Sequence, residues 1–289
     1  MAPQVSAHPE HIREIPAPGV TLHALDRHPG GSPALLLLHG WLDHCRGFDW
    51  LIASLPDSFR TIALDFRGHG RSGHAPGGLY HLTDYLADVE FALEACRVQR
   101  AHLVGHSLGG TVALLYAAAR PERVASLTAI ESVGPPRTTG DLPVHRLRRF
   151  VADLHKPALK RVYRSVEEAA GRLRANNPGL SEAAALQFAR FGTRSVEGGV
   201  QFTFDPAHRR TSGVTLDEEQ TLSCLRAVEC RVQVIAGSRG FSFDEERMRN
   251  RLRALRAGDP VRVEGGHHVH LDSPAEVARL VAEFVSGEV

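Results

Sequence analysis

The chain has 289 residues, of which 43% are hydrophobic, so it can bury a large core as one large domain or as one domain with a sizeable insertion. Its 34 Lys and Arg nearly balance its 33 Asp and Glu, and the formal net charge of +1 argues against nucleic acid or an anionic membrane as a partner. No run approaches the ~18 apolar residues of a membrane span, and the N-terminus has no apolar signal-peptide core, so we expect a cytoplasmic protein.

Four cysteines occur in the chain, at Cys45, Cys96, Cys224 and Cys230. They show neither CxxC spacing nor the framework of a small disulfide-rich domain. Reduced thiols are therefore expected, most of them as small core residues, which agrees with a cytoplasmic location.

Short apolar runs alternate along the chain with longer helical patterns. The apolar runs predict strands at 19–28, 34–40, 59–65, 101–107, 124–132, 231–237 and 260–265. The helical patterns predict helices at 82–96, 108–119, 244–257 and 275–285. Strands that alternate with helices in this way predict an α/β fold with a doubly wound, mostly parallel sheet.

The alternation stops between residues 134 and 225. The Pro/Gly-rich exit "GPPRTTGD" is followed by helical patterns with no strand between them. We interpret this segment (134–225) as a helical cap inserted between core strands, with 1–133 and 226–289 forming the core. Such a cap would cover one edge of a site, although a helical decoration on the solvent side is the alternative. Its aromatic residues could line an apolar pocket or form the cap's own core: Phe150, Tyr163, Phe188, Phe191 and Phe202.

A nucleophile motif, G-x-S-x-G, occurs in "VGHSLGG" with Ser107 at its centre. It directly follows the apolar run "AHLV" and precedes a helical pattern, which is the strand–turn–helix context that a nucleophile elbow requires. The sharp turn would expose the Ser107 hydroxyl at a helix N-terminus that stabilises developing negative charge. We interpret His106 as a packing or hydrogen-bonding neighbour, because adjacent side chains point in different directions.

Acyl transfer also needs hydrogen-bond donors directed at the developing oxyanion. One is expected from the backbone N–H of Leu108, the residue after the nucleophile, and the other from the loop "HGWLD" through the N–H of Trp41. Gly40, Leu42 and His106 adjoin this chemistry and are expected to line the substrate pocket. His39 is interpreted as a structural loop residue.

Four motifs in this chain occur in the order and at the distances typical of the α/β-hydrolase superfamily: "HGWLD", "ALDFRGHGRS", "VGHSLGG" and "GGHHVHLDSP". The segments "HGWLDH…FDWLIASLP" and "RSGH" and the cap sequence most resemble its serine hydrolase-like branch. The resemblance covers nearly the whole chain and implies an α/β-hydrolase fold. Gly68, His69 and Gly70 match a structural loop motif of the superfamily and are left out of the site.

The resemblance implies that the catalytic histidine follows the last strand, in the pattern G-H-x-x-x-L-[DE]-x-P, which selects His267. This agrees with the requirement that the base lie at the carboxyl end of its strand, where Ser107 also lies. His268 and His270 are expected near the site or at the surface. A metal site is not expected, because adjacent His267 and His268 cannot easily share one ion.

At the position where the superfamily most often carries the orienting acid, this sequence departs from the commonest pattern. That pattern, I-x-G-x-x-D, reads here from Ile235 to Gly240 and lacks the carboxylate. Two substitutes exist. Glu131 ends the strand after the nucleophile helix, and similar family members carry their acid there; Asp244 lies four residues beyond the empty position but also resembles a helix N-cap. We favour Glu131, whose buried carboxylate would need a partner such as His267.

These residues together predict a serine hydrolase that cleaves a carboxylic ester or thioester of a small or medium apolar substrate. Ser107, His267 and Glu131 would form the triad and pass through an acyl-enzyme, with no metal or organic cofactor. The expected partner is a small-molecule acyl substrate, with neither nucleic acid nor a membrane.

Three alternatives remain at this stage. A carbon–carbon bond hydrolase or a cofactor-free perhydrolase would use the same triad. A non-catalytic ligand-binding protein of the same fold is favoured by the empty acid position. Haloalkane dehalogenases and epoxide hydrolases of this fold place Asp at the elbow, so Ser107 argues against them.

Overall fold

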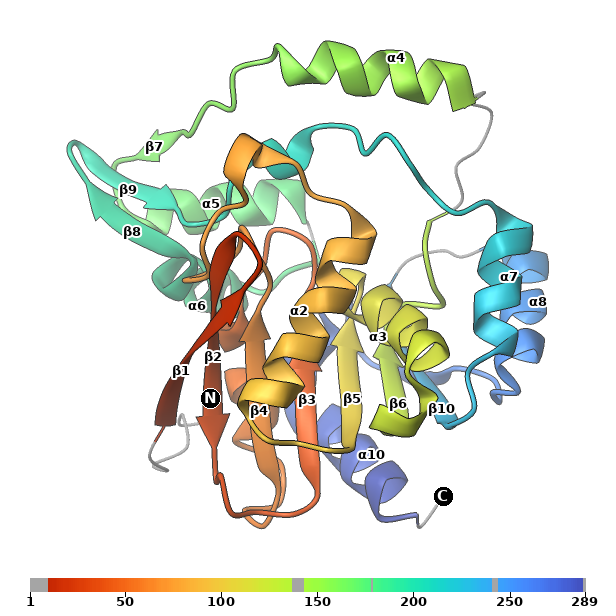
Figure 1. Cartoon of the computed structure of the whole chain (residues 1–289). Helices are drawn as coiled ribbons and strands as arrows, with labels where there is room; N and C mark the ends of the chain where they lie inside the picture. The colour runs from red at the N-terminus through yellow and green to blue at the C-terminus, as the bar shows by residue number, and fades with distance from the viewer. Residues whose placement is uncertain (1–9, 137–142, 178, 241–243, 288–289) are drawn as a thin grey trace.

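A computed structural model of the chain describes residues 10–136, 143–177, 179–240 and 244–287. Its centre is an eight-stranded sheet in the order β1-β2-β4-β3-β5-β6-β10-β11 (Figure 1). The strands are β1 (Glu10–Ala17), β2 (Val20–Arg27), β3 (Ala34–Leu38), β4 (Arg60–Asp65), β5 (Ala101–His106), β6 (Val124–Ile130), β10 (Arg231–Gly237) and β11 (Val261–Val263).

The strands from β4 to β11 in this order are all parallel, while β1 and β2 pair antiparallel at one edge. Every residue of β4 is buried, as expected for a strand covered on both faces. The prediction of a doubly wound, mostly parallel α/β sheet is confirmed. Because parallel strands end at one edge of the sheet, the residues that follow β3, β5, β6 and β11 come together there.

Helices cover both faces of the sheet. On one face lie α2 (Leu82–Ala95), α3 (Leu108–Ala119), α7 (Glu218–Arg226) and α8 (Glu245–Leu255). On the other lie α1 (Asp49–Ile52), α9 (Val269–Asp272) and α10 (Pro274–Ser286). In the part of the chain that the structure describes, no helix has the length and apolarity that crossing a bilayer would require.

Strand β1 was absent from the sequence prediction. It forms a hairpin with β2 through a turn in which Gly19 has φ 77°. Its sequence, EHIREIPA, buries Ile15 but leaves Ile12 largely exposed. An edge strand needs only one apolar face, so a run this polar produces little of the signal that identifies a buried strand.

The inserted segment lies above the carboxyl ends of the strands (Figure 1). It comprises α4 (Pro143–Leu154), β7 (Val162–Tyr163), α5 (Val166–Asn176), α6 (Glu182–Gly192), β8 (Thr193–Val196), β9 (Gly199–Phe202) and the 3-10 turn η4 (Pro206–Arg209). The expectation of helices with no strand between them is wrong here, because β7, β9 and β8 form a small antiparallel sheet. The last helix of the predicted insertion, α7, packs against α3 and α8 of the core.

Two adjacent glycines explain why the β8–β9 hairpin forms. Gly198 has φ 80° in the tight turn, a conformation that glycine adopts without strain. Gly199 lets β7 approach closely, since a Cβ there would collide with the carbonyl oxygen of Tyr163. A Gly-Gly pair between two short runs is a hairpin signal that the periodicity analysis overlooked.

Candidate active site

Ser107 occupies the tight turn between strand β5 and helix α3. Its backbone angles, φ 51° and ψ −108°, are unfavourable for a residue other than glycine. Two backbone hydrogen bonds hold this conformation: the Ser107 N–H donates to the Ile130 oxygen at 2.9 Å, and the Thr111 N–H donates to the Ser107 oxygen at 3.0 Å. The side chain of Ser107 borders two cavities above the sheet.

The glycines on either side of Ser107 make this turn sterically possible. A Cβ at Gly105 would collide with the backbone of Gly109, and a Cβ at Gly109 would collide with the carbonyl group of Leu38. Helix α3 can therefore begin directly against the ends of β3 and β5. This close packing is the physical reason for the G-x-S-x-G spacing.

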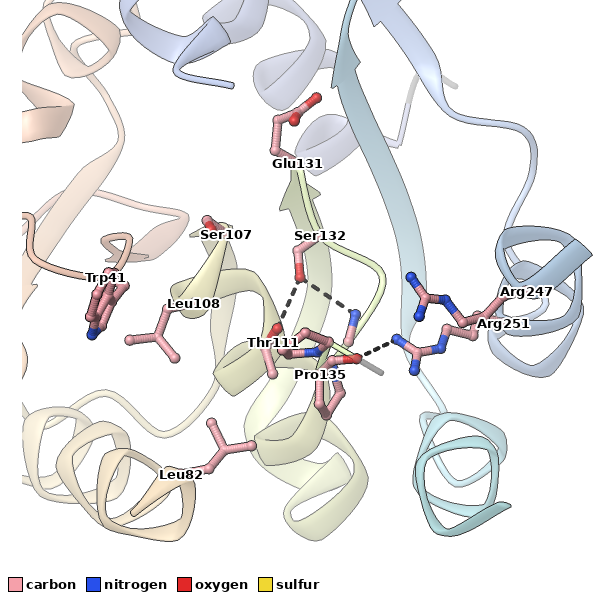
Figure 2. A pocket seen from close by; sticks show the side chains of 12 residues that line it. Trp41, Leu82, Ser107, Leu108, Thr111, Glu131, Ser132, Pro135, Arg247 and Arg251 are labelled. Atoms are coloured by element: carbon pink, nitrogen blue, oxygen red, sulfur yellow. Dashed lines mark hydrogen bonds between the residues drawn. The ribbon is translucent and has the colours of Figure 1, made fainter. Parts of the chain in front are cut away.

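Glu131 and His267 form a buried pair beside the elbow. Glu131 directly follows β6, with φ 55°, and its side chain is fully buried. Its Oε2 lies 3.0 Å from Nδ1 of His267, and its Oε1 accepts a hydrogen bond of 2.7 Å from the Gly237 N–H. This contact fixes the ring so that Nε2 is the nitrogen left for a reacting group. Figure 2 shows Ser107 at the start of α3 and Glu131 at the end of β6.

The empty acid position has a steric explanation. Gly240 stands where the commoner pattern has its carboxylate, and a Cβ at Gly240 would collide with the Glu131 carboxylate. The two positions therefore share one space, so a carboxylate in that space can come from either chain position. Sequence reasoning could recognise the absence at Gly240 but not the overlap in space.

Asp244 has a different role in the structure. It is exposed at the N-cap of α8, where its Oδ1 accepts a hydrogen bond of 2.8 Å from the Arg247 N–H. A carboxylate at a helix N-terminus satisfies an otherwise free N–H and interacts favourably with the helix dipole. The structure thus brings Glu131, and not Asp244, to His267.

The two expected oxyanion donors lie on either side of Ser107. Leu108 is the first residue of α3, and Trp41 follows the turn at Gly40 after β3. Within the described chain, neither backbone N–H donates to another protein group, as is usual for the first turn of a helix. The Trp41 side chain is 53% exposed and borders the same cavities as Ser107.

The three clustered histidines occupy different environments. His267 and His268 are both partly exposed and border the same cavity, whereas His270 is fully buried. Burial lowers the pKa of His268 to about 3. His270 is fully buried against Phe48 and His106, so of the two expected locations, near the site or at the surface, it has the first. The short helix α9 turns it inward.

His106 directly precedes Ser107 and contacts His267. Its Nε2 donates a hydrogen bond of 2.8 Å to the backbone oxygen of His267, which ties the histidine loop to the elbow. Burial lowers the pKa of His106 well below its ordinary value, so the ring is neutral at pH 7. The interpretation of His106 as a hydrogen-bonding neighbour agrees with this geometry.

Asp43, His106 and His270 form a buried polar group next to the elbow, and sequence reasoning missed Asp43 although it follows "HGWL". One ligating atom of each lies within 4.8 Å of the others. Burial raises the pKa of Asp43 well above its ordinary value and lowers the pKa of both histidines. Imidazole and carboxylate are Zn²⁺ ligands, so these residues could hold such an ion if Asp43 ionised.

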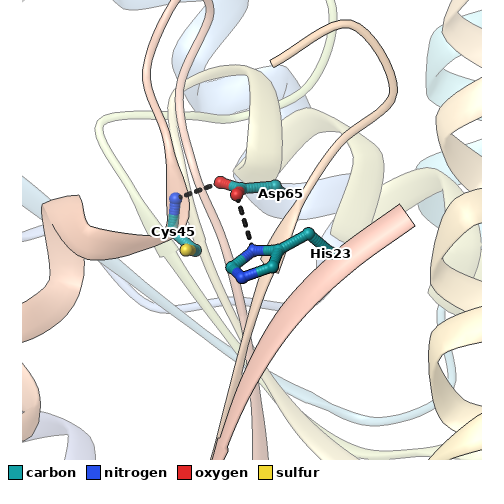
Figure 3. A group of neighbouring side chains, drawn as sticks. All are labelled: His23, Cys45 and Asp65. Carbon is teal, nitrogen blue, oxygen red and sulfur yellow. Dashed lines mark hydrogen bonds and ion pairs between the residues drawn. The ribbon is translucent and has the colours of Figure 1, made fainter. Parts of the chain in front are cut away.

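A second buried group, His23, Cys45 and Asp65, is closed by its own hydrogen bonds (Figure 3). The carboxylate of Asp65 lies 2.9 Å from Nδ1 of His23 and accepts a hydrogen bond of 2.6 Å from the Cys45 N–H. It also accepts a hydrogen bond from the Arg71 N–H. Asp65 therefore organises the loops around β4, and this group serves the structure of the loops.

An apolar cavity extends from Ser107 on the side of α2 and α3. It has a volume of about 450 Å³ and is bordered by Trp41, Leu82, Leu108 and Pro135 (Figure 2). These four residues also border a larger apolar cavity of about 920 Å³ that continues along α2, α3 and α7. The two cavities can therefore accommodate an apolar group attached to a carbon at Ser107.

A second cavity extends from Ser107 beneath the cap, with a volume of about 630 Å³. The three predicted pocket residues, Gly40, Leu42 and His106, border it together with Ser107 and His267. Of the cap aromatics considered in the sequence, this cavity is bordered by Tyr163, Phe188 and Phe202. Phe150 packs instead near His81, and Phe191 packs against Arg46.

Comparison with known proteins agrees with this fold. The family described as the alpha/beta hydrolase fold matches residues 33–274, and the chain belongs to this family. Within it, the chain is a member of the serine hydrolase-like branch. It is 31% identical to a serine hydrolase-like protein of Danio rerio over 94% of this chain and 87% of that protein. The serine hydrolase-like protein 2 of Homo sapiens is 28% identical over 88% of this chain and 87% of its own length.

Solved structures show the same architecture. A hypothetical protein of Pseudomonas aeruginosa PAO1 is 34% identical, with a TM-score of 0.85 over 96% of this chain and 99% of that chain. A thioesterase domain from the curacin biosynthetic pathway has a TM-score of 0.84 over 94% of this chain and 99% of that chain, at 24% identity, and shows the fold alone. The family match and the serine hydrolase-like relatives together support a hydrolase.

Proposed function

We propose that this protein is a serine hydrolase that cleaves a carboxylic ester or thioester through an acyl-enzyme. The observation that carries the proposal is the contact between His267 and Glu131 beside Ser107 in a strained elbow. A buried carboxylate that orients an imidazole next to an exposed hydroxyl is the arrangement that nucleophilic acyl transfer requires. The carboxylate at Glu131 also removes the main argument for a non-catalytic binding protein.

The reaction follows from these positions. Ser107 Oγ attacks the carbonyl carbon, and Nε2 of His267 accepts its proton as the C–O bond forms. The backbone N–H groups of Trp41 and Leu108 stabilise the oxyanion, while Glu131 orients the imidazole and stabilises its positive charge. His267 then donates the proton to the leaving alcohol or thiol.

The acyl-enzyme is hydrolysed by the same groups. His267 takes a proton from a water molecule, the resulting hydroxyl attacks the acyl carbon, and Ser107 leaves with the proton returned by His267. The apolar cavities bordered by Trp41, Leu82 and Leu108 favour an acyl or alcohol part that is itself apolar.

A fluorophosphonate probe tests the proposal directly. An activated serine is phosphonylated, so wild-type protein should be labelled and Ser107→Ala should not. A panel of p-nitrophenyl esters and acyl thioesters should show turnover by the wild type alone. Absence of labelling and of turnover in folded wild-type protein would reject a hydrolase and favour a binding role.

A further inference from the structure

Three arginines border the cavity beneath the cap. They come from separate elements: Arg161 immediately precedes β7, Arg172 lies in α5, and Arg209 lies in η4. The same cavity is bordered by Ser107 and His267 at its inner end. Three elements of the cap thus place exposed arginines at the border of the cavity that also contains Ser107.

Among the described residues, no carboxylate of the protein itself neutralises these three arginines. The buried arginines Arg67 and Arg251 are paired with Asp88 and Glu218, whereas the three arginines of this cavity are exposed at its border. Among the described residues, Arg161, Arg172 and Arg209 form no ion pair with any carboxylate. Their hydrogen-bond donors are available to a ligand.

Two of the three guanidinium groups are held against aromatic rings. The Arg161 guanidinium lies 5.2 Å from the centroid of the Tyr163 ring, and that of Arg209 lies 5.1 Å from the Phe204 ring. Such stacking orients a guanidinium but leaves its N–H edge free for a bidentate contact. The side chains of Asn176 and Asn177 add amide groups to the same cavity.

The remaining wall of the cavity does not neutralise this charge. Its one carboxyl among the described lining residues is Asp43, which stands against the three guanidinium groups of Arg161, Arg172 and Arg209. The cavity is therefore positively charged and adjoins an apolar cavity at Ser107.

We propose that the cavity beneath the cap binds an anionic group of the substrate, a carboxylate or a phosphate, through Arg161, Arg172 and Arg209. This inference rests on the proposed serine hydrolase function. The substrate is then an amphiphilic ester or thioester: its apolar part occupies the cavity between α2 and α3, its carbonyl lies at Ser107, and its anionic part lies beneath the cap. Arginine is the side chain best suited to recognise such planar or tetrahedral oxyanions.

Matched substrates test this inference. One arm uses an apolar acyl ester of a carboxylate-bearing alcohol, the second replaces the carboxylate by a phosphate, and the third caps the carboxylate as a neutral methyl ester. The wild type should prefer at least one anionic ester over the neutral ester by tenfold or more in kcat/KM. That is the size expected for one charge-assisted hydrogen bond or more. Whichever anionic arm is preferred identifies the group.

Substitution of the arginines then locates the site. The triple variant Arg161→Gln/Arg172→Gln/Arg209→Gln should lose this preference, mainly through a higher KM, while turnover of the neutral ester stays within about twofold. Arg174→Gln, two residues from Arg172 on the same helix and exposed, is the matched control and should retain the preference. Single variants follow in case the triple variant does not fold.

Two outcomes would overturn the inference: a wild type that prefers the neutral ester, or a triple variant that keeps the anionic preference. Failure of the hydrolase proposal is distinguished by the fluorophosphonate probe, which should label the wild type and the triple variant equally. As a further readout, calorimetry can measure binding of the carboxylate-bearing alcohol that hydrolysis releases. This alcohol should bind the Ser107→Ala variant at least tenfold more tightly than it binds the variant that combines Ser107→Ala with the three arginine substitutions. This comparison does not depend on turnover.

Discussion

The backbone conformation of Glu131 and its hydrogen bonds to β10 together hold it beside His267. It follows β6 in a left-handed conformation, with φ 55°, and its N–H donates to the Ile235 oxygen at 2.8 Å. Both carboxylate oxygens are engaged, by the Gly237 N–H and by His267. A buried carboxylate needs such partners, because an unpaired buried charge is costly.

We expect Glu131→Gln to lower kcat by about 10³–10⁴-fold, because an amide can stabilise neither the correct tautomer nor the imidazolium. Asp244→Asn should leave kcat within about twofold, since Asp244 caps α8 and does not contact His267. Steady-state kinetics on one activated ester compares the two variants. An active Glu131→Gln enzyme together with an inactive Asp244→Asn enzyme would refute the assignment of the acid.

The shared space at Gly240 provides a sharper test. Gly240→Ala should reduce activity at least tenfold, because the added Cβ collides with the Glu131 carboxylate. In a Glu131→Ala background that space is free, so Gly240→Asp should recover activity relative to Glu131→Ala alone. Gly258→Ala, where an added Cβ meets no atom within 4 Å, is the control for a glycine substitution. No recovery in the folded double variant would contradict the overlap of the two positions.

Among the elements, the small cap sheet is the one that periodicity failed to predict. Its strands contain two to four residues, so no alternation can develop over their length. The sheet holds Tyr163 and Phe202, and Tyr163 in turn stacks with Arg161. The cap sheet therefore positions part of the charged cavity wall.

Gly199→Ala should destabilise this sheet. The added Cβ meets the Tyr163 carbonyl, and φ 145° at Gly199 is unfavourable for alanine, so we expect a loss of about 1–3 kcal/mol in the free energy of unfolding. Gly171→Ala in helix α5 is the matched control: an added Cβ meets no atom within 4 Å there, and alanine should stabilise the helix by about 0.5–1 kcal/mol. Urea unfolding measures both changes, and equal stability of the two variants would argue against the role given to Gly199.

For the whole molecule, buried neutral histidines determine the expected pH dependence of stability. Burial lowers the pKa of His39 and His208 to about 4 and that of His268 to about 3. Between these values and the ordinary pKa near 6.5, the unfolded chain binds protons that the folded chain does not, so stability is lost as the pH falls. At pH 5, each such histidine lowers the free energy of unfolding by about 2 kcal/mol.

Buried carboxyl groups have the opposite effect on the pH dependence of stability. Burial raises the pKa of Asp43 and Asp88, so they retain protons that the unfolded chain loses, and their contribution to stability declines as the pH rises above about 4. Because the neutral histidines are more numerous, we expect urea unfolding to show lower stability at pH 5 than at pH 7.5. His39→Gln should reduce that difference by about 2 kcal/mol and exposed His145→Gln should not. Equal stability at both pH values would contradict this expectation.

The sheet and the sharp strand–turn–helix at Ser107 could be predicted from the sequence because their signals are local. Buried parallel strands are apolar along their whole length, and a strand–turn–helix with glycines around Ser107 is dictated by contacts within a few residues. The edge strand β1 and the cap strands escaped prediction because exposed or very short strands carry little periodicity.

The acid and the charged cavity depend on contacts between distant parts of the chain. Glu131 and Gly240 compete for one space although 109 positions separate them in sequence, and Arg161, Arg172 and Arg209 reach one cavity from three elements of the cap. From the sequence alone, both Glu131 and Asp244 are candidates for the acid that orients His267. Packing brings Glu131 alone to His267, because the sheet places the end of β6 beside the histidine loop while Asp244 is turned outward to cap α8.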